Sequence, residues 1–290
     1  MSIREPSHAG SWYTENGNKL SQELEDWLRN AQVSQTGPVR AIIAPHAGYR
    51  YSGRCAAYAY KAIDPSTVKR IFLLGPSHHY YLRNCALSKC THYRTPIGDI
   101  PIDTGVYQEL HNTGKFCEMN IDVDEAEHSL EMHLPYIAKI MAGYQYTLVP
   151  IMVGGLSPDS EALYGRLLSK YMDDPGNIFI ISSDFCHWGK RFNFTFYDKR
   201  QGPIHKSIEA LDHAGMEIIE RSDPAAFSQY LVDFENTICG RHPIGVLLNI
   251  VTSCQSKLET RFVQYEQSSP CQNMNDSSVS YASALVFRQS

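Results

Sequence analysis

Four short runs of apolar residues interrupt an otherwise mixed sequence, and none of them alternates with polar residues. A continuous apolar run of this kind, rich in β-branched and aromatic residues, is typical of a strand covered on both faces in a mostly parallel sheet. We therefore predict four buried strands: Ala41–Ala44, Ile71–Leu74, Thr147–Val153 and Ile178–Ile181.

Longer segments between and after these runs carry apolar residues at intervals of three and four, the spacing of one helix face. The predicted helices are Lys19–Asn30, Thr104–Gly114, Ser160–Met172 and Ile204–Arg221. Strands that alternate with helices predict an α/β fold, a three-layer sandwich with a mostly parallel central sheet. Pro243 is compatible with the first turn of a further helix, and Val279–Phe287 predicts a closing strand.

The chain shows little sign of internal division. His8–Tyr13 (HAGSWY) is echoed once by His46–Tyr51 (HAGYRY), and a single echo without a period is weak support for duplication. No low-complexity linker separates one part from another. We therefore predict one domain that spans residues 1–290.

Charge and cysteine content narrow the classes of function. The net charge of −5 leaves no basic surplus for binding nucleic acid. The eight cysteines include no CxxC pair, which indicates reduced thiols. The first residues lack the apolar core of a signal peptide, and no apolar run is long enough for a membrane span. A cytoplasmic protein is expected, with nuclear access left open.

Histidines follow three of the four predicted strands. His46 comes after the first, His78 and His79 after the second, and Asp184 and His187 after the fourth. In open parallel sheets the ligand crevice lies beyond the carboxyl ends of the strands. We therefore expect His46, His78 and His187 to share one pocket.

Converging imidazoles together with one anionic ligand suit zinc, copper, iron or nickel. Spacing alone does not choose the anionic ligand, and the candidates are Asp184, Glu127, Glu131 and Cys239. A single histidine after a strand is more often a hydrogen-bonded loop residue than a ligand, but three such coincidences favour a shared site. An inert network of hydrogen-bonded histidines is the bland alternative.

Other residues near these motifs also have two interpretations. His128 and His133 are five residues apart, on different faces of a helix, so we expect them to support ligands or cap a helix rather than both bind metal. Asp184 either caps the turn after its strand or orients His187. Trp12 and Tyr51 either pack in the core or wall the pocket, and Arg191 is by default a solvated charge.

Six motifs together resemble the Memo family, named as mediator of ErbB2-driven cell motility, along nearly the whole chain. They are SHAGSWY, IIAPHAGYRYSG, LGPSHH, EHSLEMHLPY, SSDFCHWG and NTICGRHPIG. That family is similar in turn to the class III extradiol dioxygenases, non-haem iron enzymes that cleave catechol rings. The resemblance implies a dioxygenase-like α/β sandwich with a pocket at the strand ends.

The resemblance also implies roles for particular residues. His46 and His78 match the two metal-site histidines, and His187 matches the histidine that handles protons. Cys239 stands in the place of the dioxygenase glutamate, which argues against ring cleavage. Two imidazoles and a thiolate suit copper, zinc or a redox-active iron.

Two functions of different classes follow from the resemblance. In the first, His46, His78 and Cys239 bind copper or iron, with zinc as a further candidate, and His187, oriented by Asp184, moves protons while the metal meets oxygen or a small reductant. In the second, the pocket is part of an adaptor that links a phosphotyrosine peptide of a receptor tyrosine kinase to cytoskeletal signalling proteins. There His79 and Arg191 would meet the phosphate, and Trp12 or Tyr51 would stack on the ring.

Overall fold

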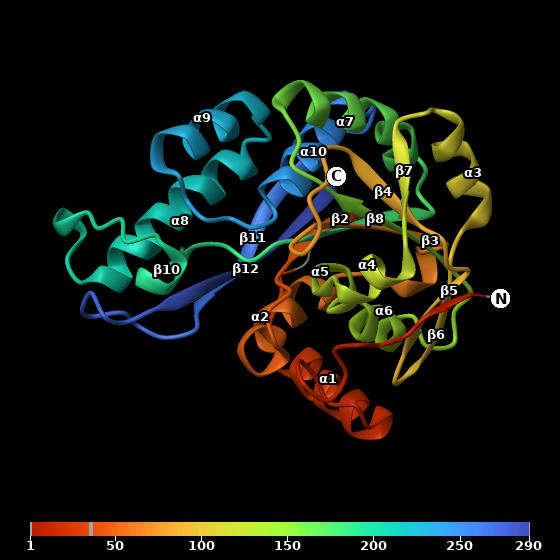
Figure 1. Cartoon of the computed structure of the whole chain (residues 1–290), viewed down its shortest axis with the longest axis horizontal. Coiled ribbons are helices and arrows are strands. Elements are labelled where there is room, and N and C mark those ends of the chain that lie inside the picture. The colour runs from red at the N-terminus through yellow and green to blue at the C-terminus, as the bar shows by residue number, and fades with distance from the viewer. Residues whose placement is uncertain (1, 35–36, 290) are drawn as a thin grey trace.

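A large mixed β-sheet forms the centre of the computed structural model, which describes residues 2–34 and 37–289 (Figure 1). Its middle consists of parallel strands in the order β2, β9, β3, β8. Their bounds are β2 (Val39–Ala44), β9 (Asn177–Ser182), β3 (Arg70–Pro76) and β8 (Thr147–Val153). These strands contain the four predicted apolar runs, so that prediction is confirmed.

Antiparallel strands extend the sheet on both sides. On one side β4 (Cys85–Ser88) pairs antiparallel with β8, and β7 (Phe116–Met119) pairs parallel with β4. On the other side β12 (Ser278–Arg288) runs antiparallel to β2 and to β11 (Leu258–Gln267), and β10 (His187–Trp188) pairs with its first residues. The predicted closing strand is therefore confirmed as β12, and only the centre of the sheet is wholly parallel.

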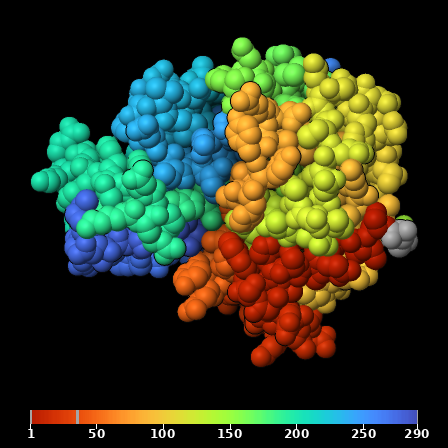
Figure 2. Space-filling view, viewed as in Figure 1, coloured from red at the N-terminus to blue at the C-terminus, as the bar shows by residue number. Residues whose placement is uncertain are grey.

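A smaller sheet combines the N-terminal segment with a hairpin. It has the order β1 (Ile3–Arg4), β5 (His92–Thr95) and β6 (Gly98–Pro101). Behind it, the buried Arg4 guanidinium donates to the Asp124 and Glu131 carboxylates at 3.1 and 2.8 Å. This contact attaches the N-terminal segment to the helices that flank the candidate site, and the space-filling view shows that segment, in red, against them (Figure 2).

Helices cover both faces of the large sheet. α7 (Pro158–Met172) and α10 (Arg241–Ser253) pack on one face, and α2 (Tyr49–Lys61) packs on the other against β2 and β12 (Figure 1). α1 (Gly17–Asn30) lies outside α2, where the Trp27 ring fits against Gly53 so closely that a Cβ there would come within 2.5 Å of it. Pro243 lies in the first turn of α10, as predicted.

Among the remaining helices, α3 (Thr104–Asn112) and α8 (Ile204–Glu220) correspond to the other two that the sequence predicted. The others are α4 (Ile121–Ala126), α5 (His128–Glu131), α6 (Leu134–Ile140) and α9 (Pro224–Phe234). Short 3₁₀ turns occur at Pro65–Thr67, Lys190–Phe192 and Lys199–Gln201. Predicted helix ends agree with α1, α3, α7 and α8 within two residues, because polar caps such as Asn16 and Asp103 accept backbone N–H groups where the helices begin.

The two HAG motifs adopt different structures. His8–Tyr13 forms a turn closed by a bridge between Ala9 and Tyr13, whereas the second motif leads directly into α2. The two segments meet where the Tyr49 N–H donates to the Trp12 carbonyl at 3.0 Å. The echo thus reflects two neighbouring turns rather than a repeated unit.

Candidate metal centre

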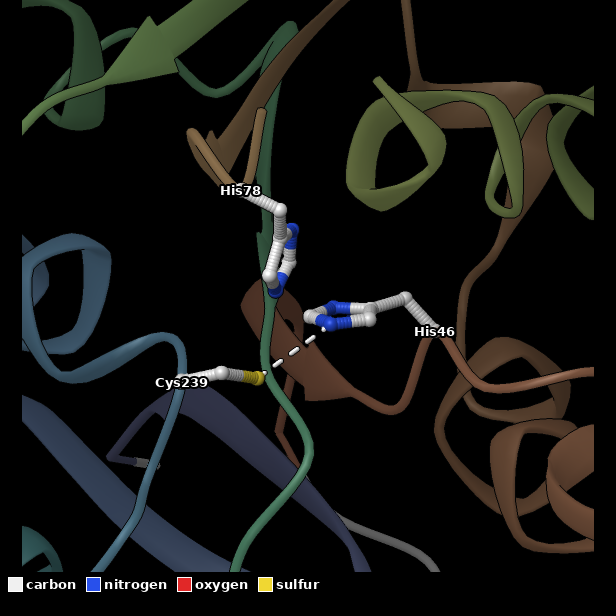
Figure 3. A group of neighbouring side chains, drawn as sticks. All are labelled: His46, His78 and Cys239. Atoms are coloured by element: carbon white, nitrogen blue, oxygen red, sulfur yellow. Dashed lines mark hydrogen bonds between the residues drawn. The ribbon is translucent and has the colours of Figure 1, made fainter. Parts of the chain in front are cut away.

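Three predicted ligands converge beyond the ends of the parallel strands (Figure 3). His46 follows β2, His78 follows β3, and Cys239 precedes α10, so each comes from a different element. Their potential ligand atoms all lie within 4.8 Å of one another. The three side chains form a cluster that could hold a metal ion, in agreement with the prediction.

The His46 ring is held through its Nδ1 atom. Ser182 Oγ donates to the Ser129 carbonyl at 2.7 Å, so the same oxygen accepts from His46 Nδ1 at 2.7 Å. This leaves the lone pair on Nε2, which lies 3.2 Å from Cys239 Sγ. Burial, reinforced by the His78 and His128 imidazoles, lowers the pKa of His46 well below its usual value. His46 is therefore neutral, the form that binds a metal.

The His78 ring is held in the same way by a carboxylate. Glu127 Oε1 accepts from His78 Nδ1 at 2.8 Å and Oε2 accepts from the His78 backbone N–H at 2.6 Å. Burial would lower the pKa of His78, but hydrogen bonds with Cys239 and Glu127 outweigh it and raise that pKa to about 10. Burial likewise opposes ionisation of Glu127, yet His78 holds the pKa of this carboxyl at about 2. A carboxylate behind a ligating imidazole fixes its tautomer and ring orientation.

Cys239 is placed by the close approach of the segment before α10 to the end of β9. A Cβ on Gly240 would lie 2.3 Å from Ser183 Cβ, so only glycine allows this approach. The Asp184 backbone N–H donates to Cys239 Sγ at 3.3 Å. Burial raises the pKa of the thiol, and the hydrogen bond with His78 counteracts part of that rise. A bound cation would replace the protons of this cluster and stabilise the thiolate.

His187 and Asp184 lie next to the cluster. The His187 Nδ1–H is shared between the carbonyls of Phe185 and Thr237, each at 2.9 Å, and Nε2 has no hydrogen-bond partner among the described residues. Asp184 Oδ1 accepts from the His46 backbone N–H at 2.9 Å. Backbone carbonyls, rather than Asp184, fix the orientation of the His187 ring. Burial raises the pKa of Asp184, and the His187 charge opposes this.

A cavity of about 640 Å³ opens beside the cluster. His46, His78 and His187 contribute to its wall, so the three histidines share one pocket as predicted from the strand ends. The remaining wall combines aromatic rings with hydroxyl groups of the loop before β12 and the end of β11. The cavity would admit a small molecule or a side chain of a partner to the donor atoms.

Comparison with known proteins identifies the family. The profile described as Memo-like protein matches residues 4–285. The chain belongs to the Memo family. It is 57% identical over 292 residues to Protein MEMO1 of Danio rerio, covering 99% of this chain and 98% of that protein.

Further relatives confirm this membership. Protein MEMO1 of Homo sapiens is 56% identical over 98% of this chain and 97% of its own length. Protein memo-1 homolog of Caenorhabditis elegans is 47% identical over 98% of this chain and 82% of its own. A solved structure, an uncharacterized protein from Escherichia coli K12, has a TM-score of 0.48 and 12% identity, covering 84% of this chain and 99% of that one.

Four residues of this Memo-family chain were predicted to bind a phosphotyrosine peptide, and three of them line the cavity. Trp12, Tyr51 and Arg191 all line the cavity. The Arg191 guanidinium lies 4.8 Å over the Phe192 ring and has no ion-pair partner among the described residues. His79 is exposed, with its ring 6.4 Å from His78.

In the structure, His128 lies directly against His78, one of the predicted metal ligands. Its ring stacks between His78 and Trp12, with centroids 4.3 and 4.4 Å away. Burial, reinforced by His78, lowers the pKa of His128 to about 3. His133 instead lies deep in the core, where its Nδ1 meets the Tyr60 hydroxyl at 2.6 Å. His128 is thus a wall of the site, whereas His133 belongs to none of the groups of close donor atoms among the described residues.

The acidic candidates for the anionic ligand are now distinguished. Glu131 accepts hydrogen bonds from Arg4, His8 and Tyr13 away from the cluster. Glu127 with His78 and His128, and Asp184 with His187 and Cys239, form two further groups of close donor atoms that share members with the main cluster.

Within the described residues, no helix has the length and apolarity needed to cross a membrane.

Proposed function

We propose that this protein is a metal-binding redox protein that holds copper or iron with His46, His78 and Cys239. The observation that carries the proposal is the fixed direction of the donor atoms. Both imidazoles use Nδ1 for a buried partner and keep Nε2 toward Cys239 Sγ. Such an arrangement provides metal ligands whose orientation does not depend on the metal.

The donor set decides which metals fit. Once a metal displaces the protons of His78 and Cys239, two imidazoles and a thiolate favour copper, zinc or iron over magnesium or calcium, which take oxygen ligands. When bound, copper or iron would supply one-electron redox chemistry toward oxygen with a small-molecule reductant. The resemblance to class III extradiol dioxygenases supports this position for the site, but ring cleavage is not proposed because Cys239 replaces the carboxylate.

The side chains around the cluster have separate tasks in this proposal. His187 accepts or delivers a proton through Nε2, because its Nδ1 is committed to two carbonyls. Asp184 fixes the turn that carries His46 and places a negative charge near His187.

The first experiment is metal analysis of protein purified under reducing, anaerobic conditions, followed by oxygen consumption with a reductant. We expect bound copper or iron in the wild type and loss of both metal and oxygen uptake in Cys239→Ala. Cys254→Ala is the matched control, because Cys254 is also partly buried but lies after α10, outside the cluster. Unchanged metal content and oxygen uptake in Cys239→Ala would refute the proposal.

A second candidate function is phosphotyrosine-peptide binding in receptor signalling and cell motility, inside the cell. It is favoured by the unpaired Arg191 guanidinium in the wall of a cavity that also presents Trp12 and Tyr51. A guanidinium can bind the phosphate, while an aromatic ring stacks on the tyrosine. Fluorescence titration with a phosphorylated peptide and its unphosphorylated twin tests it, and equal affinities would exclude it.

A further inference from the structure

A second cavity lies beside the metal centre, between the turn at residues 10–14 and the helices α1 and α2. This aromatic groove has a volume of about 610 Å³ and contains none of the three proposed metal ligands. Its principal side chains are Trp12, Trp27, Tyr49, Tyr51, Arg50 and Glu23. Trp12 and Tyr51 also border the metal-centre cavity, so the two spaces are neighbours.

The floor of the aromatic groove is rigid. The Tyr13 hydroxyl donates to Glu131 Oε1 at 2.8 Å, and its ring lies 5.6 Å from that of Tyr49. The Trp27 ring meets the Tyr49 ring edge-on at 6.0 Å and is supported from behind by Gly53. Aromatic rings fixed in this way lose little conformational entropy when a ligand stacks on them.

Two tryptophans that line the groove carry polar groups without partners. The indole N–H groups of Trp12 and Trp27 reach solvent and have no hydrogen-bond partner within residues 2–34 and 37–289. By contrast, Trp188 Nε1 donates to the Phe196 carbonyl at 2.8 Å. Exposed indole donors beside packed aromatic rings can bind backbone carbonyls of an extended chain.

Glu23 adds a charge to the groove. Its carboxylate accepts only the Thr14 hydroxyl, at 2.9 and 3.0 Å, and no cation of the described chain lies within ion-pair distance. The Arg50 guanidinium lies 5.2 Å over the Tyr51 ring and so already occupies one aromatic face. This positive charge disfavours a free quaternary ammonium as the ligand, but not an uncharged proline ring.

We propose that the aromatic groove binds an extended, proline-rich peptide with a basic residue that pairs with Glu23. A polyproline II helix has no internal hydrogen bonds, so its carbonyls remain available to the two indole donors. Its rings pack into aromatic-lined grooves, and its preformed shape reduces the entropy lost on binding. The basic residue fixes the direction in which the peptide lies.

Tryptophan fluorescence can follow the binding directly, because two of the three tryptophans line the groove and Trp188 is fully buried. The probes are a proline-rich peptide with one terminal arginine, the same peptide with glutamate in place of arginine, and a glycine–serine peptide of equal length. We expect saturable binding of the first peptide, weaker binding of the second, and at least about tenfold weaker binding of the third.

Variants distinguish an effect on peptide binding in the groove from an effect on folding or on the metal centre. Trp27→Phe keeps an aromatic ring against Gly53 but removes the indole donor, so binding should weaken about five- to tenfold. Glu23→Gln should abolish the preference for arginine over glutamate. Tyr51→Ala should also weaken binding, while Tyr144→Ala, an equally exposed tyrosine away from the groove, should not.

Three outcomes would overturn the proposal. The first is equal affinity for the proline-rich and glycine–serine peptides. The second is self-association of the protein that Tyr51→Ala abolishes, which would make a second copy the occupant. The third is tighter binding of a phosphotyrosine peptide in the same groove. Metal content measured in Trp27→Phe and Glu23→Gln should equal that of the wild type. If peptide binding is not observed, the proposal for the metal centre is therefore unaffected.

Discussion

Replacement of Glu127 by glutamine tests whether the metal centre depends on the carboxylate behind His78. Glu127 is 1% exposed and accepts three hydrogen bonds, from the His78 ring, the His78 backbone N–H and the Ser129 backbone N–H. All three groups are donors. A glutamine has one oxygen and one NH₂ group, so either orientation of its amide turns at least one of these contacts into two opposed donors.

The size of the effect follows from these contacts. Loss of one buried, charge-assisted hydrogen bond costs about 1.5–3 kcal/mol. If that cost falls on the metal-binding orientation of His78, metal affinity should fall about 10- to 100-fold. Cys239→Ala, which removes a ligand, should weaken binding further. Because the pKa of Glu127 is about 2, the wild-type carboxylate is ionised throughout the neutral range.

Anaerobic titration of copper or iron against a competing chelator measures the affinity, and urea denaturation of the metal-free protein measures the stability separately. Glu118→Gln is the control, since the Glu118 side chain is 54% exposed on β7. An affinity of Glu127→Gln within about twofold of the wild type, in a protein of native stability, would refute the orienting role of Glu127.

The remaining predictions concern other buried polar contacts. Ser182→Ala removes the acceptor of His46 Nδ1 and should weaken metal binding about tenfold in the same chelator titration, with little effect on oxygen uptake at saturating metal. Arg4→Ala leaves Asp124 and Glu131 without their shared cation and should lower the free energy of unfolding in urea by about 3–5 kcal/mol; a loss below 1 kcal/mol would contradict this. Burial lowers the pKa of His133 to about 3 in the folded protein. As the pH falls below 6.5, His133 is therefore protonated in the unfolded chain but not in the folded one. Stability is therefore fully present above that pH, and the wild type should lose about 2 kcal/mol more than His133→Gln between pH 6.5 and 5, as measured by denaturant unfolding at each pH.

The strand-end histidines were predictable because two simple rules apply to them. A continuous apolar run is a buried strand, and residues just beyond parallel strands meet at one edge of the sheet. These rules place His46, His78 and His187 in one pocket without any knowledge of the loops. Cys239 was different, since it precedes a helix and follows no apolar strand, and only the resemblance to the Memo family selected it among four anionic candidates.

His128 shows why the rest of the site could not be predicted from spacing. One continuous helix would place His128 and His133 on different faces. In the structure α5 ends at Glu131 and α6 begins at Leu134, with Pro135 in its first turn. The break turns His128 toward His78 while His133 enters the core. A short apolar segment with a proline does not reveal where its helix is interrupted.

The two histidines of the candidate metal centre, His46 and His78, are therefore held by different parts of the fold. Ser182 ends β9, and His46 and Asp184 lie just beyond the ends of β2 and β9, neighbouring parallel strands whose hydrogen bonds fix where these residues start. His78 has a wall that comes from outside the sheet: Glu127 before α5, His128 stacked on its ring, and Trp12 stacked on His128. This wall is attached to the N-terminal segment through the buried Arg4 pairs and the contact between His8 and Glu131. A change in residues 3–13 should thus act on the surroundings of His78 more directly than on those of His46, because the wall of His78 is attached to that segment and the hydrogen bonds of His46 to Ser182 and Asp184 are not.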